Sequence, residues 1–135
     1  MARWRGPLVA RALSVPETTP VIRLERLRLA DGTPMALEVS HLVADRVPGL
    51  LDLNLGQHSL YELLRQRFGI ELVGASQSLE AMLADPHEAR ALHVREGDPL
   101  LRLERVTLDG SGRPVEFMRS VYRADRYRFT VQLVR

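Results

Sequence analysis

The chain has 135 residues, 45% hydrophobic and 27% charged, with no cysteine, and its 19 basic residues, all arginine, are interleaved with 17 acidic ones for a net charge of +2. These totals predict a single globular domain and exclude a disordered chain, disulfides, thiolate metal sites and the basic stripe of a nucleic-acid surface. No apolar run approaches the ~20 residues of a membrane helix and no secretion signal leads the sequence, so a cytoplasmic protein is expected.

An internal repeat divides the chain into two halves. When the sequence is shifted by 79 positions, residues 10–29 fall on residues 89–108 with 12 of 20 identical. One inserted residue then aligns two further pairs, Pro34 with Pro114 and Ser40 with Ser120. Twelve ungapped matches exceed what chance gives in a chain rich in leucine and arginine. Each half is therefore predicted to carry a short helix, a connector and a β-hairpin.

The N-terminal residues 1–9 precede the repeated part. By the same shift, the strand predicted at 70–83 should have a counterpart ahead of Ala10, where only nine residues stand. We interpret residues 1–9 as a tail or a truncated first strand of one domain that spans residues 1–135.

Two hairpins are predicted by their turns. Strands at 20–29 and 34–43 flank Ala30-Asp31-Gly32-Thr33, in which Asp-Gly supplies the turn. Strands at 99–108 and 114–123 flank a connection of the same kind. A last strand is predicted at 127–134, where alternate apolar residues would share one face: Tyr127, Phe129, Val131 and Leu133.

Two helices are indicated by their first residues. Ser59 and Glu62 are spaced as a capping box, apolar residues follow at helical spacing, and Gly69 stands where a helix ends. Asp85 followed by Pro86 predicts the start of a second, shorter helix.

Two arginines of the first hairpin are the leading candidates for a ligand site. Because alternate residues of a strand share a face, Arg26 and Arg28 point the same way, beyond the apolar Ile22 and Leu24. An anion shared between two planar guanidiniums explains this spacing better than a solvated strand face, which would suffice for Arg26 alone.

Four other residues could complete such a site. Ser59 has a structural role as a cap, but a helix N-terminus also attracts anions, and Tyr61 could reach the same pocket or simply pack. Glu38 and Glu116 lie on strand faces with apolar neighbours, so each carboxylate needs a partner, either an internal arginine or a ligand hydroxyl.

Catalytic and metal-binding patterns are missing from the sequence. The four histidines, His41, His58, His87 and His93, have no metal-ligand spacing. Neither a Ser-His-Asp order nor a phosphate loop nor a glycine fingerprint is present. No catalytic residue, metal or cofactor is expected.

The hairpin and helix motifs resemble a known family. The run 20–38, the motif Ser59-Leu60-Tyr61 with Phe68-Gly69-Ile70, and the run 120–129 are similar to the UTRA effector-binding domain of the HutC subfamily of GntR transcription regulators. The resemblance covers residues 10–133. It implies an α+β, chorismate-lyase-like fold: an antiparallel sheet of two related hairpins with helices packed on it.

The resemblance also implies roles for individual residues. Arg26, Arg28 and Ser59 fall where family members hold a phosphate or carboxylate. Glu38, Glu116 and Tyr122 fall where sugar-sensing members contact the rest of the ligand, and Tyr61 is added to this set. A homodimer is implied, with DNA bound only through an N-terminal winged-helix domain that these 135 residues do not include.

Three functions compete at this stage. The favoured one is a sensor domain that binds a small anionic effector, a sugar phosphate or organic acid, and controls DNA binding allosterically. The second is a lyase on the same fold that removes a small acid from a hydroxylated aromatic substrate. The third is a degenerate module kept only for dimerisation.

Overall fold

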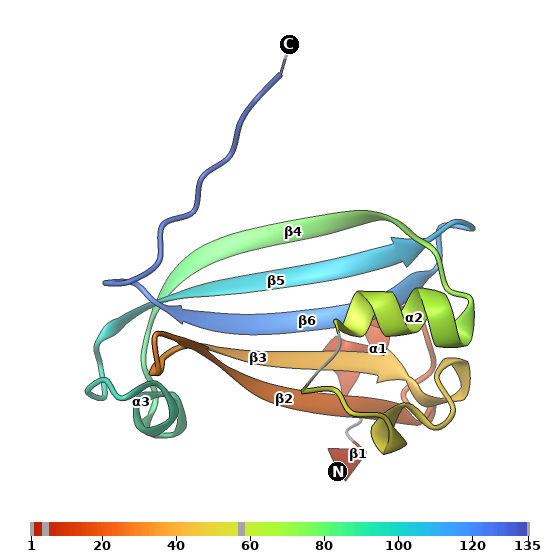
Figure 1. Ribbon diagram of the computed structural model, residues 1–135, viewed down its shortest axis with the longest axis horizontal. Helices are drawn as coiled ribbons and strands as arrows, with labels where there is room; N and C mark the ends of the chain where they lie inside the picture. Colours follow the sequence, from red (N-terminus) through yellow and green to blue (C-terminus); the bar gives the residue numbers. More distant parts are fainter. Residues whose placement is uncertain (1, 4–5, 57–58, 135) are drawn as a thin grey trace.

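A computed structural model describes residues 2–3, 6–56 and 59–134. It contains one antiparallel sheet of six strands in the order β1-β2-β3-β6-β5-β4, with three helices packed on it (Figure 1). The elements run along the chain as β1 (Ala2–Arg3), α1 (Pro7–Leu13), β2 (Val21–Ala30), β3 (Thr33–Val43), α2 (Leu60–Phe68), β4 (Leu72–Leu83), α3 (Pro86–Leu92), β5 (Pro99–Asp109) and β6 (Pro114–Arg123). Two single-turn helices, Ala44–Arg46 and Leu50–Asp52, lie between β3 and α2.

The internal repeat corresponds to a two-fold pattern in the sheet. α1 and α3 are 79 residues apart at both ends, and each is followed by a residue in the left-handed conformation, Ser14 and His93. β2 pairs with β3 as β5 pairs with β6, and the two hairpins meet where β3 pairs with β6. The prediction of two related halves is confirmed, and so is the α+β architecture.

The first hairpin turns at Asp31 and Gly32. Both residues have positive φ, 51° and 79°, which a two-residue type I′ turn requires and which Asp-Gly tolerates. The turn sets Ala30 opposite Thr33, and a bulge between Arg28 and Leu29 then shifts the register by one residue, so that Arg26 faces Glu38 across the ladder. The local sequence therefore determines which side chains of β2 and β3 become neighbours.

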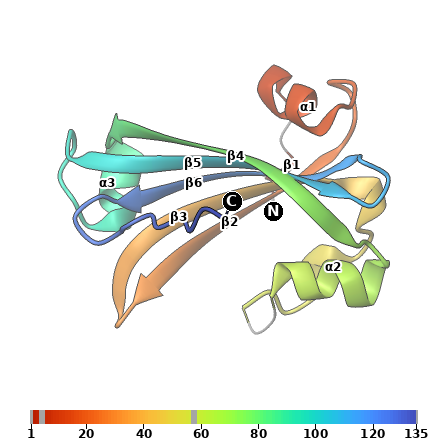
Figure 2. The same ribbon diagram turned by 90° about the horizontal axis from the view of Figure 1, so that it is seen from above.

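Helices cover both faces of the sheet, as Figure 2 shows: α2 lies on one face, and α1 lies on the other. Because strand residues alternate, even-numbered residues of β2, β3 and β6 and odd-numbered residues of β5 point to the α2 face. The core under α2 contains Ile22, Leu24, Leu42, Leu60 and Leu64. On the opposite face, α1 packs with Val21 and Phe117, and α3 packs with Leu37, Leu100 and Val121.

Two sequence predictions about local structure are wrong. Residues 127–134 form no strand: they extend away from the sheet as an exposed arm (Figure 1), because none of the strands that the structure describes lies beside them to supply hydrogen bonds. Ser59 is the N-cap residue just before α2, but no capping hydrogen bond of its side chain is found among the described residues. Asp85, in contrast, forms a full capping box with Glu88.

Part of the N-terminal segment, predicted to be a tail or a truncated first strand, is a short strand in the structure. Ala2–Arg3 forms a two-residue strand on the outer side of β2, at the place where the repeat puts the counterpart of β4. Among the described residues, no helix is long and apolar enough to cross a membrane.

Candidate effector site

A cavity of about 460 Å³ lies between α2 and the sheet. Six of the seven residues proposed from the sequence line it: Arg26, Arg28, Glu38, Ser59, Tyr61 and Glu116. The others that line it are Leu55, Gly56, Leu60, Arg105 and Met118. The cavity joins residues that are far apart in the sequence, from Arg26 to Met118, because the α2 face of the sheet collects side chains from all four central strands.

The arginines of β2 meet a buried carboxylate at one end of the cavity. Nη1 of Arg28 donates to Oε1 of Glu38 at 3.0 Å, and Nη2 of Arg26 lies 3.9 Å from Oε2 of the same side chain. The Glu38 side chain is only 5% exposed, so it requires this cationic partner. The internal-arginine alternative for Glu38 therefore describes the contacts in this structure. Two guanidiniums against one carboxylate leave this end with a positive charge.

Ser59 contributes a hydroxyl group that the helix does not use. It is exposed, lines the cavity and makes no capping bond in the described part of the chain. The first N–H groups of α2 lie beside it, and such groups together with a hydroxyl favour negative charge.

A polar network closes the other end of the cavity. The hydroxyl of Tyr61 donates to Oε1 of the buried Glu116 at 2.8 Å and lies 3.3 Å from Oγ1 of Thr107. Burial and then the neighbouring charge of Glu116 raise the pKa of Tyr61 above its usual value. Tyr61 therefore remains protonated and joins α2 to the second half of the sheet.

Arg105 lines the cavity but is not among the residues proposed from the sequence. It lies on β5, lines the cavity, and its Nη1 donates to the hydroxyl of Tyr61 at 3.4 Å. The signal was available in the repeat, because a shift of 79 positions places Arg26 on Arg105. Only the fold shows that both residues face one cavity.

Tyr122 does not line the cavity. Its ring stacks on Tyr127 with centroids 4.2 Å apart, and burial followed by the nearby Glu38 raises its pKa. Its proposed contact with a ligand remains a prediction.

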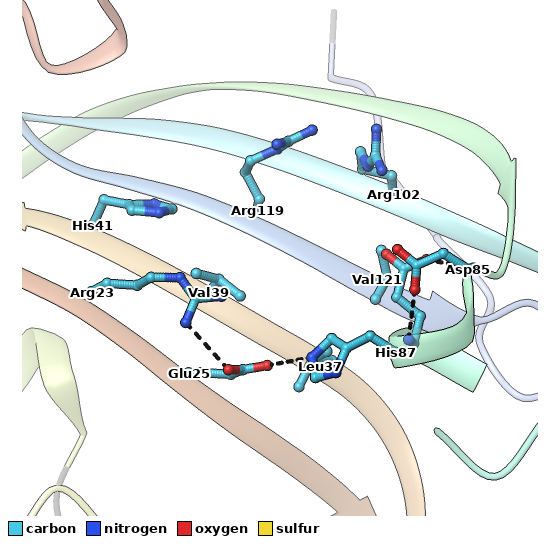
Figure 3. Close-up of a pocket in the computed structure, with 11 residues that line it drawn as sticks. Arg23, Glu25, Leu37, Val39, His41, Asp85, His87, Arg102, Arg119 and Val121 are labelled. Carbon is cyan, nitrogen blue, oxygen red and sulfur yellow. Dashed lines mark hydrogen bonds and ion pairs between the residues drawn. The ribbon is translucent and has the colours of Figure 1, made fainter. Parts of the chain in front are cut away.

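A second cavity, of about 270 Å³, lies on the opposite face beside α3 (Figure 3). Its lining has three arginines and three acidic residues, Arg23, Arg102 and Arg119 with Glu25, Asp85 and Glu88. Each of these arginines contacts a carboxylate, although Nε of Arg119 has no partner in the described residues. Its charges balance, whereas the α2 cavity has three arginines and two glutamates.

The histidines occupy separate places. His41 is buried, donates from Nδ1 to the carbonyl of Phe117 at 3.0 Å, and has a pKa lowered mainly by burial. His87 contacts Glu25 at 3.0 Å, His93 ends α3, and His58 lies outside the described residues. The described residues include no cluster of three potential metal ligands.

The fold and the α2 cavity define a small-molecule-binding domain of the α+β class. Residues 5–128 match the family described as the UTRA domain. The chain belongs to this family.

Curated relatives are transcription regulators. The chain is 36% identical over 123 residues to the HTH-type transcriptional repressor PhnF of Mycolicibacterium smegmatis, covering 91% of this chain and 50% of that protein. It is 34% identical over 121 residues to the HTH-type transcriptional repressor NagR of Bacillus subtilis, covering 90% and 49%. The chain thus spans about half the length of these relatives.

A solved structure has the same fold. The effector domain of PhnF from Mycobacterium smegmatis superposes with a TM-score of 0.92 at 32% identity, covering 99% of this chain and 83% of that one. The part of the relatives that this chain matches is therefore the effector-binding part.

Proposed function

We propose that this domain senses a small anionic effector for a bacterial transcription regulator and performs no chemistry on it. The observation that carries the proposal is the meeting of Arg26, Arg28 and the unused hydroxyl of Ser59 in one cavity at the start of α2. A guanidinium pair and a helix N-terminus are complementary to a phosphate or carboxylate.

Effector binding would exchange one partner of the arginines for another. In the structure, Glu38 contacts both guanidiniums. A phosphate or carboxylate that enters between Arg26, Arg28 and Ser59 contacts strand β2 and helix α2 at the same time, and so links their positions. The ligand shifts the protein only by its difference in affinity for two arrangements, and such coupling is typically ~1–3 kcal/mol.

The whole regulator would contain a DNA-binding part in addition to this domain. Support comes from the relatives, which are HTH-type repressors about twice as long as this chain. In that setting the domain acts in the cytoplasm and reaches DNA only through a winged-helix domain.

We also propose that the domain forms a homodimer through its C-terminal arm. β4 is an edge strand of twelve residues and is exposed along nearly its whole length. The arm carries alternating apolar side chains, Phe129, Val131 and Leu133, all exposed. An open edge with unpaired N–H and C=O groups is a template for a strand of another chain, so the arm of one copy would pair with β4 of the next.

Light scattering after gel filtration tests the dimer. Val131→Asp places a charge on the apolar side of the arm, while Gln132→Asp adds the same charge on the other side. We expect Val131→Asp to give monomers and Gln132→Asp to leave the dimer intact. A dimer that survives Val131→Asp would contradict the role of the arm.

Calorimetric titration tests the effector site. The probes are inorganic phosphate, citrate and hexose 6-phosphates, titrated into the chain and into the double variant Arg26→Ala/Arg28→Ala. Each lost charge-assisted hydrogen bond costs about 1.5–3 kcal/mol, so the double variant should lose binding altogether. Arg90→Ala, an exposed arginine on α3, is the matched control. Unchanged binding in the double variant would contradict the site.

A further inference from the structure

Arg105 stands on the far side of the effector cavity from the arginine pair. β3 and β6 lie between β2 and β5 in the sheet, so the backbones of Arg26 and Arg105 are three strand spacings, about 14 Å, apart. A phosphate group held by Arg26, Arg28 and Ser59 would therefore lie against β2 and the start of α2, whereas Arg105 enters the cavity from β5. An effector that uses both ends of the cavity must be longer than its anionic head.

The two repeat-related arginines of the α2 cavity share a feature with Arg119 of the second cavity. Nε of Arg26 and Nε of Arg105 are both buried, and neither has a hydrogen-bond partner among the described residues. A buried N–H without an acceptor costs folding free energy, so such groups in native proteins normally have a ligand or water as partner. The repeat thus places two groups with unused donors on opposite sides of one cavity.

The existing contacts of Arg105 leave most of its donors available. Within the described part of the chain, its only side-chain hydrogen bond is the long one, 3.4 Å, to the hydroxyl of Tyr61, and it forms no ion pair there. A guanidinium has five N–H donors. Arg28, in contrast, holds a carboxylate at 3.0 Å.

The end of the cavity at Arg105 has both a hydrogen-bond acceptor and a hydrogen-bond donor. Glu116 is 1% exposed and can only accept, and Arg105 can only donate, while both line the cavity. Their charges cancel, so this end does not attract a second anionic group. It suits neutral oxygens, a hydroxyl that donates to Glu116 and accepts from Arg105, or a carbonyl that accepts from Arg105.

We propose that Arg105 determines effector specificity by binding hydroxyl or carbonyl oxygens at the end of the effector remote from its anionic head. The inference rests on the proposed function, because it takes the head to lie at Arg26, Arg28 and Ser59. It assigns the effector to ligands with a phosphate or carboxylate at one end and neutral oxygens at the other.

Comparison of a short probe with long ones isolates Arg105. Dissociation constants are measured for inorganic phosphate and for a set of hexose 6-phosphates, with the unmodified chain, Arg105→Ala, Arg105→Lys and Arg102→Ala. Arg102 lies on the same strand but on the opposite face of the sheet, so it is the matched control. Arg105→Lys keeps the charge and removes Nε, and it serves if Arg105→Ala does not fold.

The expected result is a selective loss. The best hexose phosphate binds the unmodified chain more tightly than phosphate does, and Arg105→Ala and Arg105→Lys reduce that advantage by about tenfold, the size of one charge-assisted hydrogen bond. Phosphate affinity changes less than twofold, and Arg102→Ala behaves as the unmodified chain.

Three outcomes would overturn the inference. They are equal weakening of both probes by Arg105→Ala, an unchanged preference for the hexose phosphate, and no hexose phosphate that binds better than phosphate. The first two leave the arginine pair intact as an anion site. Failure of every probe to bind the unmodified chain overturns the proposed function as well, and so the two failures are distinguishable.

Discussion

The two halves of the repeat agree where side chains pack and differ where side chains face the cavity. Leu13 and Leu92 are repeat-related, and both are buried in the core on the same face of the sheet. Arg28 and Thr107 are also repeat-related, but only the arginine contacts Glu38, while the threonine contacts Tyr61. The comparison shows that a duplicated scaffold can hold one asymmetric site, because packing restrains core positions and leaves the cavity wall free to diverge.

The segments that follow the two hairpins differ as well. After β3 the chain forms α2 and covers one face of the sheet, whereas after β6 it leaves as an exposed arm. Among the described residues, the cavity under α2 therefore has no symmetric counterpart on the same face of the sheet.

The largest expected effect tests the shared core. Leu13→Ala and Leu92→Ala each remove a fully buried side chain, and each should lower the free energy of unfolding by about 2–5 kcal/mol. Urea unfolding followed by circular dichroism measures both. If one variant cost less than about 1 kcal/mol, far below the usual range for a buried leucine, the two helices would not be equivalent in packing.

A smaller effect is expected where the halves differ. Arg28→Thr gives the first half the residue of the second and removes a charge-assisted contact, so phosphate affinity should fall by about tenfold or more. Thr107→Ser keeps the hydroxyl near Tyr61 and should change phosphate affinity little. Similar losses in both variants would show that the halves contribute equally to anion binding.

The smallest effect concerns the contact between α2 and the second half. Tyr61→Phe removes the hydrogen bond to Glu116 and should cost about 0.5–1.5 kcal/mol of unfolding free energy. The raised pKa of Tyr61 means that the folded state holds this proton more tightly than the unfolded state. Stability should therefore be intact below pH 10 and fall as pH rises through the raised pKa.

Unfolding curves at high pH separate Tyr61 from other groups. Tyr61→Phe should lose part of the alkaline dependence of stability. Tyr122 also has a raised pKa and no hydrogen bond to Glu116 is found for it in the described residues, so Tyr122→Phe is the comparison. If the free energy of unfolding of Tyr61→Phe fell at high pH as it does in the unmodified chain, burial would not raise the pKa of the Tyr61 hydroxyl.

Local chemistry explains which features the sequence could predict. The Asp31-Gly32 turn, the Asp85 cap and the Gly69 helix end depend on residues a few positions apart, and all three are present in the structure. The strand proposed at 127–134 needed a partner strand, which periodicity does not reveal.

The candidate site was predictable only in part. Alternation along β2 placed Arg26 and Arg28 on one face without knowledge of the fold. The bond between Tyr61 and Glu116 joins residues 55 apart, and it depends on how α2 crosses the sheet. Arg105 needed both the repeat and the topology, since a shared sequence position does not say that two residues face the same cavity.

The junction of β3 with β6 has a consequence for how the chain folds. Each hairpin closes a short loop, but β3 and β6 meet across about 80 residues of sequence, with Val39 opposite Arg119. Closing such a long loop costs chain entropy before any contact repays it, so hairpins should form first and their docking should set the folding rate. Two similar hairpins with similar inner strands also allow a hairpin to pair with its counterpart in another molecule. We therefore expect refolding to slow as protein concentration rises, and to yield domain-swapped oligomers in which molecules exchange hairpins.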